Sequence, residues 1–155
     1  HGAKPAVVEQ VITSFKTDPH RRTLIGRWEQ VDWVDDSKAT NPHAAVAAAS
    51  AYSSVVLIAG GRNKGLDLSG LMAVPQIGYV IAIGEAAGEL EEAAGDLPIV
   101  RAATMDEAVA VADRIAKAGD TVLLAPGCAS FDMFRSYADR GNRFADAVRR
   151  RKEGR

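Results

Sequence analysis

The chain has 155 residues, of which 47% are hydrophobic and 25% are charged, and its net charge is −1. This length suits one compact domain, and the near-neutral charge gives no reason to expect a nucleic-acid partner. The apolar runs are far shorter than the roughly 20 residues that span a bilayer, and no secretory signal opens the chain, so we expect a cytoplasmic protein without a membrane partner. The single cysteine, Cys128, excludes an internal disulfide.

The chain opens with a segment that differs from the rest. Its first two residues look like a tag remnant, and apolar residues at helical spacing predict a helix over 5–15. We therefore assign residues 1–20 to a linker and hinge. Two short runs rich in β-branched residues and tryptophan, 22–29 and 31–35, are close enough to pair as a hairpin.

From residue 41 onward, helix-like segments alternate with strand-like segments. Asn41 before Pro42 predicts a capped helix start, and Thr104 with Glu107 forms a capping box. The pattern predicts helices near 42–52, 69–73, 86–94, 105–118 and 131–150, and strands at 55–59, 78–83, 98–101 and 121–125. Several strands are apolar on both faces, which is typical of a parallel sheet covered by helices on each side. We expect an α/β fold: an open three-layer domain with a mostly parallel sheet and an antiparallel hairpin near the N-terminus.

Polar loops follow three strands of this predicted sheet. They are DSKATN (36–41), GGRNKGLD (60–67) and PGCASFD (126–132). Ligands of open α/β sheets bind at the carboxyl ends of the strands, where loops and helix N-termini meet. The expected topology brings all three loops to the same edge, which makes them a candidate pocket.

Two lysines distinguish the first two loops from ordinary turns. The hydroxyl and carboxyl groups of the first loop could serve as helix caps together with Asn41, but one cap needs only one side chain. Lys38 is repelled by the positive end of a helix, so its presence suggests an anionic ligand. In the second loop the paired glycines favour a turn with positive φ, while Lys64 can reach a carboxylate or phosphate as a mobile charge.

The third loop offers an anion site without a lysine. Ser130 is placed to cap a helix beginning at Phe131, where free backbone amides would bind a carboxylate and Asp132 would stabilise the helix start. Cys128 has no histidine nearby in sequence and is interpreted as a buried thiol. The aromatic residues of this region are interpreted as core-facing: Phe131, Phe134, Tyr137 and Phe144. The chain has no G-x-x-x-x-G-K-[ST] motif, and its histidines lack metal-ligand spacing, so we expect neither a complete NTPase site nor a metal site.

Four stretches carry a resemblance to a known family: PHR (19–21), DDSKATNP (35–42), AGGRNKGLDLSGL (59–71) and GDTVLLAPGCASFDMFRSYADRGNRF (119–144). In this order they resemble the carboxyl-terminal domain of the Mur ligase family, in its D-glutamate-adding branch. Other branches carry different residues at the DSKATN position, where the incoming amino acid is chosen. Gly127 departs from the family, which often has alanine there, and exchanges one small residue for another.

The resemblance implies an ATP-dependent ligase of three domains, of which only a Rossmann-like lid is present here. In the family, ATP phosphorylates the carboxylate of UDP-N-acetylmuramoyl-L-alanine, and the amine of D-glutamate attacks the acyl phosphate to form an amide of a peptidoglycan precursor. Mg and most ATP contacts belong to the central domain, which carries the phosphate loop. The implied partners are these substrates and the missing domains, in a protein that acts as a monomer.

The same resemblance assigns roles to individual residues. Lys38 is the candidate catalytic residue, because a cation near the transferring phosphoryl group offsets developing negative charge. The candidate D-glutamate ligands are Thr40 and Lys64 for one carboxylate, Ser130 and the Phe131 amide for the other, and Tyr137 as a neighbouring aromatic. Arg21 and Asp36, together with Lys38, match positions that face the nucleotide.

The resulting organisation is the linker, a lid domain over 21–150 and a basic tail at 151–155. The lid alone is expected neither to hydrolyse ATP nor to form an amide. Two alternatives remain open. One is a Mur-type lid for another amino acid, such as a diamino acid or a folate-type glutamate; the other is a stand-alone module that binds a dicarboxylate or a nucleotide without chemistry.

Overall fold

The computed structural model describes residues 18–154, so the helix expected over 5–15 lies outside the described residues. The elements are β1 Thr23–Trp28, β2 Val31–Asp35, α2 Pro42–Ala49, β3 Val55–Gly60, α3 Ser69–Met72, β4 Ile77–Ile83, α4 Ala87–Ala94, β5 Ile99–Arg101, α5 Met105–Ile115, β6 Thr121–Leu124 and α6 Tyr137–Glu153. Up to β6, each one overlaps the element expected from the sequence. Within residues 18–154, no helix combines the length and the apolar character that a membrane crossing requires.

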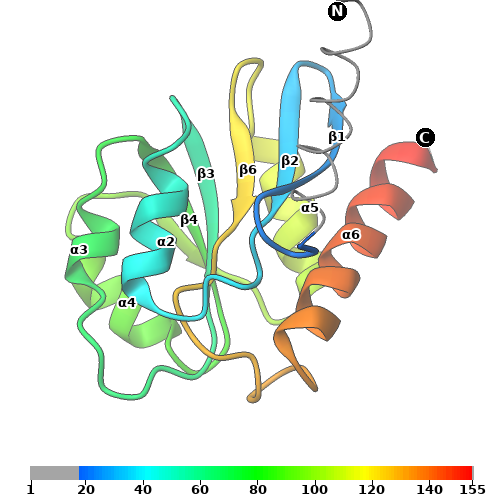
Figure 1. Ribbon diagram of the computed structural model, residues 1–155. Coiled ribbons are helices and arrows are strands. Elements are labelled where there is room, and N and C mark those ends of the chain that lie inside the picture. The colour runs from blue at the N-terminus through cyan, green and yellow to red at the C-terminus, as the bar shows by residue number, and fades with distance from the viewer. Residues whose placement is uncertain (1–17, 155) are drawn as a thin grey trace, which may run out of the picture.

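The six strands form one sheet in the order β1-β2-β6-β3-β4-β5 (Figure 1). β1 and β2 pair antiparallel, as the sequence predicted, and all other neighbours pair parallel. The hairpin turn consists of Glu29 and Gln30, with φ of 56° and 63°. Two successive residues at positive φ are the mark of a type I′ turn, whose twist matches that of the two strands.

Helices cover both faces of the sheet (Figure 1). α2, α3 and α4 lie on one face, and α5 and α6 lie on the other. Each face has its own core: Leu57 and Leu90 are buried in the first, and Ile58 and Phe144 in the second. Because consecutive residues of β3 enter opposite cores, the strand must be apolar throughout. The predicted three-layer, mostly parallel α/β fold is confirmed.

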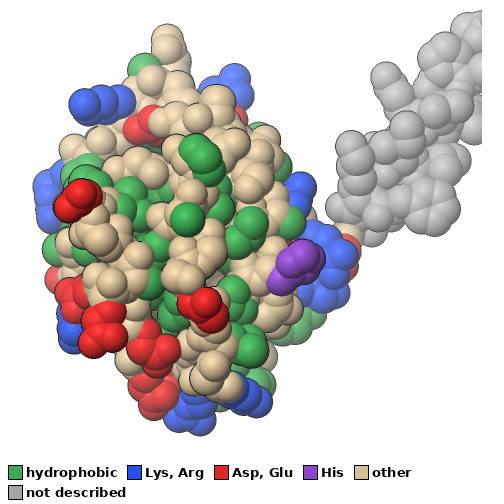
Figure 2. Space-filling model, turned by 90° about the vertical axis from the view of Figure 1, so that its left-hand side faces the viewer, with side chains coloured by type: hydrophobic (Ala, Val, Ile, Leu, Met, Phe, Trp, Pro, Cys, Tyr) green, Lys and Arg blue, Asp and Glu red, His purple; other side chains and the backbone are tan. Residues whose placement is uncertain are grey.

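Figure 2 shows the face that α2, α3 and α4 cover. Hydrophobic side chains are exposed there in separate small areas, and most acidic side chains of this face lie in its lower half. The lower end corresponds to the edge at which α2 begins and the parallel strands terminate (Figure 1). Acidic side chains on this face therefore gather toward the carboxyl edge of the sheet.

Two predicted helix caps are present. The side-chain oxygen of Asn41 accepts a hydrogen bond from the Ala44 amide at 2.9 Å. At the start of α5, Thr104 Oγ1 accepts from the Glu107 amide at 3.1 Å, and the Glu107 carboxylate accepts from the Ala103 amide at 2.9 Å. The capping at α5 is reciprocal as expected, with the carboxylate reaching one residue before the cap.

The predicted helix start at Phe131 is wrong. Residues 131–133 form a turn closed by the Ser130 carbonyl, and α6 begins only at Tyr137. Its cap is Ser136, whose Oγ accepts from the Asp139 amide at 3.0 Å.

The reason lies in the residue three positions after each serine. Asp139 returns a hydrogen bond, because its carboxylate accepts from the Arg135 amide at 3.1 Å. Met133 stands at the equivalent place after Ser130 and has no group that can do so. Only Ser136 therefore supports a reciprocal cap.

The last turn of α6 contains residues 151–153, which the sequence had set apart as a basic tail. Lys152 is buried, and its Nζ lies 2.8 Å from both a Glu29 and an Asp113 carboxylate oxygen. Arg151 also pairs with Asp113, at 2.7 Å. These ion pairs hold the end of α6 against α5 and the hairpin turn.

Candidate functional site

The loops after β2, β3 and β6 are joined to one another by backbone hydrogen bonds. Arg62, after β3, and Ala129, after β6, form an isolated antiparallel bridge with N–O distances of 2.9 and 3.0 Å. The Gly127 amide donates to the Ala39 carbonyl at 2.9 Å and so ties the loop after β6 to the loop after β2. Backbone contacts thus set the spacing between the side chains that these loops carry.

A cleft of about 240 Å³, called the small cleft below, lies between these loops. Its lining includes the five residues nominated as amino-acid ligands: Thr40, Lys64, Ser130, Phe131 and Tyr137. The same loops supply its other lining residues: Arg62, Asn63, Leu66, Gly127, Cys128 and Ala129. The volume is below the roughly 300–1,000 Å³ of sites for drug-sized ligands, so the cleft fits a small molecule. The structure brings the five residues together, and their ligand roles stay a prediction.

Two glycines make the close approach of these loops possible. Gly60 and Gly61 have φ of 126° and 129°, which disfavours any residue with a Cβ atom. A Cβ on Gly60 would lie 2.0 Å from the Ile83 carbonyl oxygen, and one on Gly61 would lie 2.3 Å from that of Ala129. The paired glycines therefore do more than turn the chain, because they let neighbouring backbone approach the loop that carries Lys64.

Lys64 is an exposed cation on this loop. The side chain of Asn63 shapes the loop, since it donates to the Leu66 carbonyl at 2.7 Å and accepts from the Leu66 amide at 3.2 Å. Within residues 18–154 Lys64 has no ion-pair partner, whereas Arg62 pairs with Glu85. Lys64 is thus available to a carboxylate or phosphate of a ligand.

A larger cleft of about 960 Å³ lies beside β1 and the loop after β2. Its lining includes the three residues nominated as nucleotide contacts: Arg21, Asp36 and Lys38. Lys38 Nζ lies 3.0 Å from Asp18 Oδ2 and 5.8 Å from the centre of the Tyr137 ring. Lys38 therefore lines the larger cleft while it contacts a residue of the small one.

The groups of the larger cleft suit a nucleotide. Burial raises the pKa of the Asp36 carboxyl, while a backbone hydrogen bond from Arg22 and the charges of Arg22 and Arg21 act in the opposite direction. Guanidinium groups match phosphate, and a carboxylate accepts from ribose hydroxyls. In the part of the chain that the structure describes, no three His, Cys, Asp or Glu side chains are grouped so that they could hold a metal ion.

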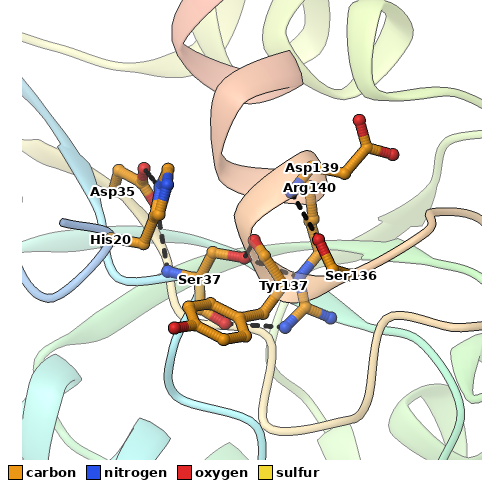
Figure 3. A network of polar contacts seen from close by, with 7 residues as sticks. All are labelled: His20, Asp35, Ser37, Ser136, Tyr137, Asp139 and Arg140. Carbon is orange, nitrogen blue, oxygen red and sulfur yellow. Dashed lines mark hydrogen bonds and ion pairs between the residues drawn. The ribbon is translucent and has the colours of Figure 1, made fainter.

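Arg140 is the centre of a polar network that joins the loop after β2 to α6 (Figure 3). This side chain is fully buried. Its Nη1 donates to the Cys128 carbonyl at 3.0 Å, and its Nε and Nη2 donate to Ser37. The arginine satisfies buried carbonyl groups on two of the loops that form the small cleft.

The network continues toward the N-terminal side of the domain (Figure 3). The Ser37 amide donates to Asp35 Oδ1 at 2.9 Å, and Asp35 Oδ2 lies 2.6 Å from His20 Nδ1. Ser37 Oγ donates to the Tyr137 carbonyl at 2.7 Å, and the His20 ring meets the Tyr137 ring edge to face, with 6.1 Å between centres. Tyr137 is thus fixed from both its backbone and its ring.

Burial sets the protonation of two groups at this centre. It lowers the pKa of Arg140 to about 10, which leaves the guanidinium charged near neutral pH. It raises the pKa of the Cys128 thiol to about 12, although the charge of Arg140 opposes this. The thiol is buried, as the sequence indicated, and its raised pKa keeps it neutral near neutral pH, which disfavours a role as a nucleophile.

The loop after β6 departs from the expectation in its side chains too. Phe131 is 62% exposed, so its predicted core position is wrong, and Phe134 and Tyr137 are only partly buried. Phe144 does lie in the core. Asp132 caps no helix; its Oδ2 instead accepts from the Glu85 amide, at 2.9 Å, in the loop after β4.

Sequence reasoning assigned no role to Arg140, although a signal was available. Arg140, Phe144 and Val148 recur every four residues along α6 and all are buried. An arginine in line with apolar residues on one helix face indicates a buried cation that must have partners. Those partners, Ser37 and Cys128, are too distant in sequence to be identified from a local pattern.

The fold and these clefts define an open α/β domain that gathers anion-binding groups at the carboxyl edge of its sheet, and the chain belongs to the Mur ligase family. The family described as "Mur ligase, glutamate ligase domain" matches residues 20–128, which confirms the resemblance. The chain is 48% identical over 156 residues to UDP-N-acetylmuramoylalanine--D-glutamate ligase of Frankia casuarinae, covering 97% of this chain and 33% of that protein.

Proteins of the same name from Thermobifida fusca and Aquifex aeolicus are 45% and 39% identical to the chain. These matches cover 96% and 95% of this chain and 34% and 37% of the two relatives. The chain therefore spans about a third of the length of the curated relatives it matches.

Solved structures share the fold at low sequence identity. UDP-N-acetylmuramate-alanine ligase MurC from Thermotoga maritima superposes with a TM-score of 0.60 at 11% identity, covering 88% of this chain and 30% of that chain. MurF ligase from the same organism, in complex with ADP, superposes with a TM-score of 0.57 at 18% identity. This match covers 90% of this chain and 32% of that chain. At these identities the likeness concerns the α/β fold alone.

Proposed function

We propose that this chain is the carboxyl-terminal domain of a ligase that adds D-glutamate to UDP-N-acetylmuramoyl-L-alanine, and that its small cleft binds the D-glutamate. The observation that carries the proposal is the convergence of Thr40, Lys64 and Ser130, from three loops, on one small cleft. D-Glutamate has two carboxylates, so its site needs anion-binding groups on different walls. The names of the relatives, which match nearly the whole chain, support the same activity.

The cleft would hold D-glutamate by its two acidic ends. Lys64 and Thr40 bind one carboxylate, while Ser130 and the Phe131 amide bind the other. Each charge-assisted hydrogen bond contributes roughly 1.5–3 kcal/mol. Tyr137 forms part of the wall, and the hydrogen bond from Ser37 to its carbonyl keeps it in place. With both carboxylates fixed, the amine of the amino acid has a defined direction.

In the ligase reaction, that amine attacks the carboxylate of UDP-N-acetylmuramoyl-L-alanine after ATP has converted the carboxylate to an acyl phosphate. An amide forms and phosphate leaves. Lys38 lies between the two clefts, where its charge offsets the negative charge that develops near the phosphoryl group. Arg21 and Asp36 of the larger cleft would hold the nucleotide. Lys38 must then exchange its present partner, Asp18, for a substrate oxygen.

The chain contains a third of the length of its relatives, so the remaining parts of the enzyme would supply the phosphate loop and the UDP-substrate site. We expect these parts to meet the carboxyl edge when the enzyme closes, with the hinge in the segment 5–20. The lid alone then hydrolyses no ATP. Measurable ATP turnover by the purified 155-residue chain would contradict this assignment.

The decisive experiment is a D-glutamate titration of the full-length enzyme. Lys64→Ala and Ser130→Ala are each expected to raise the KM for D-glutamate about tenfold or more, because a charge-assisted hydrogen bond is lost, with little change in the KM for ATP. Lys117→Ala, at the opposite edge of the sheet, is the control.

A panel of amino acids completes this experiment. Turnover with D-glutamate alone supports the proposal, whereas preference for a diamino acid or another amine would identify a Mur-type lid of different specificity. If neither variant changed the KM for D-glutamate, the assignment of the small cleft would be withdrawn.

A further inference from the structure

We propose that Arg62 is a further substrate-binding residue: its guanidinium leaves Glu85 and binds a carboxylate of D-glutamate when the small cleft is filled. This inference rests on the proposed function and adds a residue to it. Arg62 lines the small cleft two positions before Lys64. In the present structure its Nε and Nη2 lie 3.3 and 3.2 Å from the Glu85 carboxylate oxygens.

The backbone of Arg62 is fixed while its side chain is free to move. Arg62 exchanges two backbone hydrogen bonds with Ala129, the neighbour of Ser130, so its Cα belongs to the wall of the small cleft. The side chain is 46% exposed. A long side chain on a fixed backbone position at the rim of a cleft can swing between an outer partner and a ligand inside.

The pair with Glu85 is of the kind that exchanges readily. Its side chains are 46% and 59% exposed, and both N–O distances exceed the roughly 2.7–2.9 Å of strong charge-assisted hydrogen bonds. Exposed ion pairs of this type contribute little to stability. A ligand carboxylate inside the cleft would be less screened by water and would offer the planar guanidinium an alternative partner to Glu85.

The charges around the small cleft also call for a second cation. Of the described residues that line the small cleft, two have positively charged side chains, Lys64 and Arg62. This number matches the two carboxylates of D-glutamate. Arg140 is already engaged with buried carbonyl groups, and Lys38 lines the larger cleft instead of the small one. Among the described lining of the small cleft, Arg62 is therefore the cation beside Lys64 that can match the second negative charge.

The test is a double-mutant cycle in the full-length enzyme, with the KM for D-glutamate as the readout. Arg62→Gln is expected to raise this KM about tenfold. Glu85→Gln is expected to lower it about threefold, because the guanidinium no longer has an outer partner. In the Arg62→Gln background, Glu85→Gln is expected to have no effect, since the residue that it releases is absent.

Other outcomes identify different roles for the pair. If Glu85→Gln also raised the KM for D-glutamate, the Arg62–Glu85 pair would be structural. If Glu85→Gln lowered this KM equally in the wild-type and Arg62→Gln enzymes, the negative charge of Glu85 would act by repelling the ligand, without involving Arg62. Either result overturns the inference. Arg62→Lys, which keeps the charge, should recover part of the affinity. Glu91→Gln, in the exposed pair with Arg101, is the matched control and should leave the KM unchanged.

Failure of the inference can be told apart from failure of the proposed function. A wild-type enzyme without D-glutamate-dependent turnover would refute the proposed function, and Arg62 would lose its role with it. A wild-type enzyme that uses D-glutamate, together with an Arg62→Gln variant of unchanged KM, would refute the role of Arg62 alone. Thermal unfolding of each variant verifies that the exposed substitutions leave the fold intact.

Discussion

Arg140 binds Ser37 twice, with Nε 2.8 Å from the serine Oγ and Nη2 2.7 Å from the serine carbonyl oxygen, although 103 residues separate the two. A third hydrogen bond reaches the Cys128 carbonyl. Ser37 precedes Lys38, and Cys128 lies two residues before Ser130. The buried arginine therefore sets the distance between two walls of the small cleft, at carbonyl groups that water does not reach.

Replacing Arg140 with methionine should destabilise the 155-residue chain by about 3 kcal/mol or more, because buried carbonyl groups of Ser37 and Cys128 lose their donors. Urea unfolding followed by tryptophan fluorescence measures the change. Arg143→Met, on the exposed side of the same helix, should cost less than about 1 kcal/mol. Equal losses for the two variants would show that the network of Arg140 is unimportant for stability.

Gly61→Ala should destabilise the protein by about 3 kcal/mol, because a Cβ there combines a φ of 129° with a 2.3 Å approach to the Ala129 carbonyl oxygen. Gly65→Ala is the matched comparison. Its φ of 78° is also unfavourable for alanine, but no atom lies within 4 Å of the added Cβ, so the expected cost is about 1 kcal/mol. Thermal unfolding distinguishes the two, and similar costs would argue against a steric role for Gly61.

Cys128 should make the fold less stable at alkaline pH. Burial raises the pKa of its thiol from 9.0 to about 12, so its contribution to stability is complete below pH 9 and is lost as the pH rises toward 12. The difference in free energy of unfolding between wild type and Cys128→Ala should fall by about 1.4 kcal/mol per pH unit within that window. Groups away from Cys128 that titrate there affect both proteins alike, whereas the charge of Arg140, whose pKa burial lowers to about 10, opposes the effect of burial on the thiol. A difference that stayed constant with pH would contradict the buried neutral thiol.

Substitutions in the two clefts should separate the two ligands of the full-length enzyme. Arg21→Ala should raise the KM for ATP about tenfold and leave that for D-glutamate nearly unchanged, because Arg21 lines only the larger cleft. Thr40→Val should raise the KM for D-glutamate and leave that for ATP nearly unchanged, since Thr40 lines the small cleft. Arg27→Ala, at the far end of β1, serves as the control. Variants that raised both KM values together would show that the clefts do not bind separate ligands.

The sequence alone predicted most elements and their layers, because the signals for them are local. The continuous apolar run of β3 indicated burial on both faces, and Asn41 and Thr104 marked helix starts through hydrogen bonds that span three residues. Positive φ at Gly60 and Gly61 was likewise predictable from residue type. Local patterns also placed the loops that carry Thr40, Lys64 and Ser130 at a common edge of the sheet, whereas the family resemblance nominated these residues as amino-acid ligands.

What the tertiary structure decided depends on contacts between distant residues. It divided the nominated residues between a small and a larger cleft, turned Asp132 toward the loop after β4, and placed Arg140 between loops that begin about a hundred residues apart. The spacing of apolar side chains within one segment determines whether that segment forms a helix or a strand. The partner of a buried charge is determined only when separate segments pack, because desolvation forces the charge to find whatever donor or acceptor the fold brings beside it.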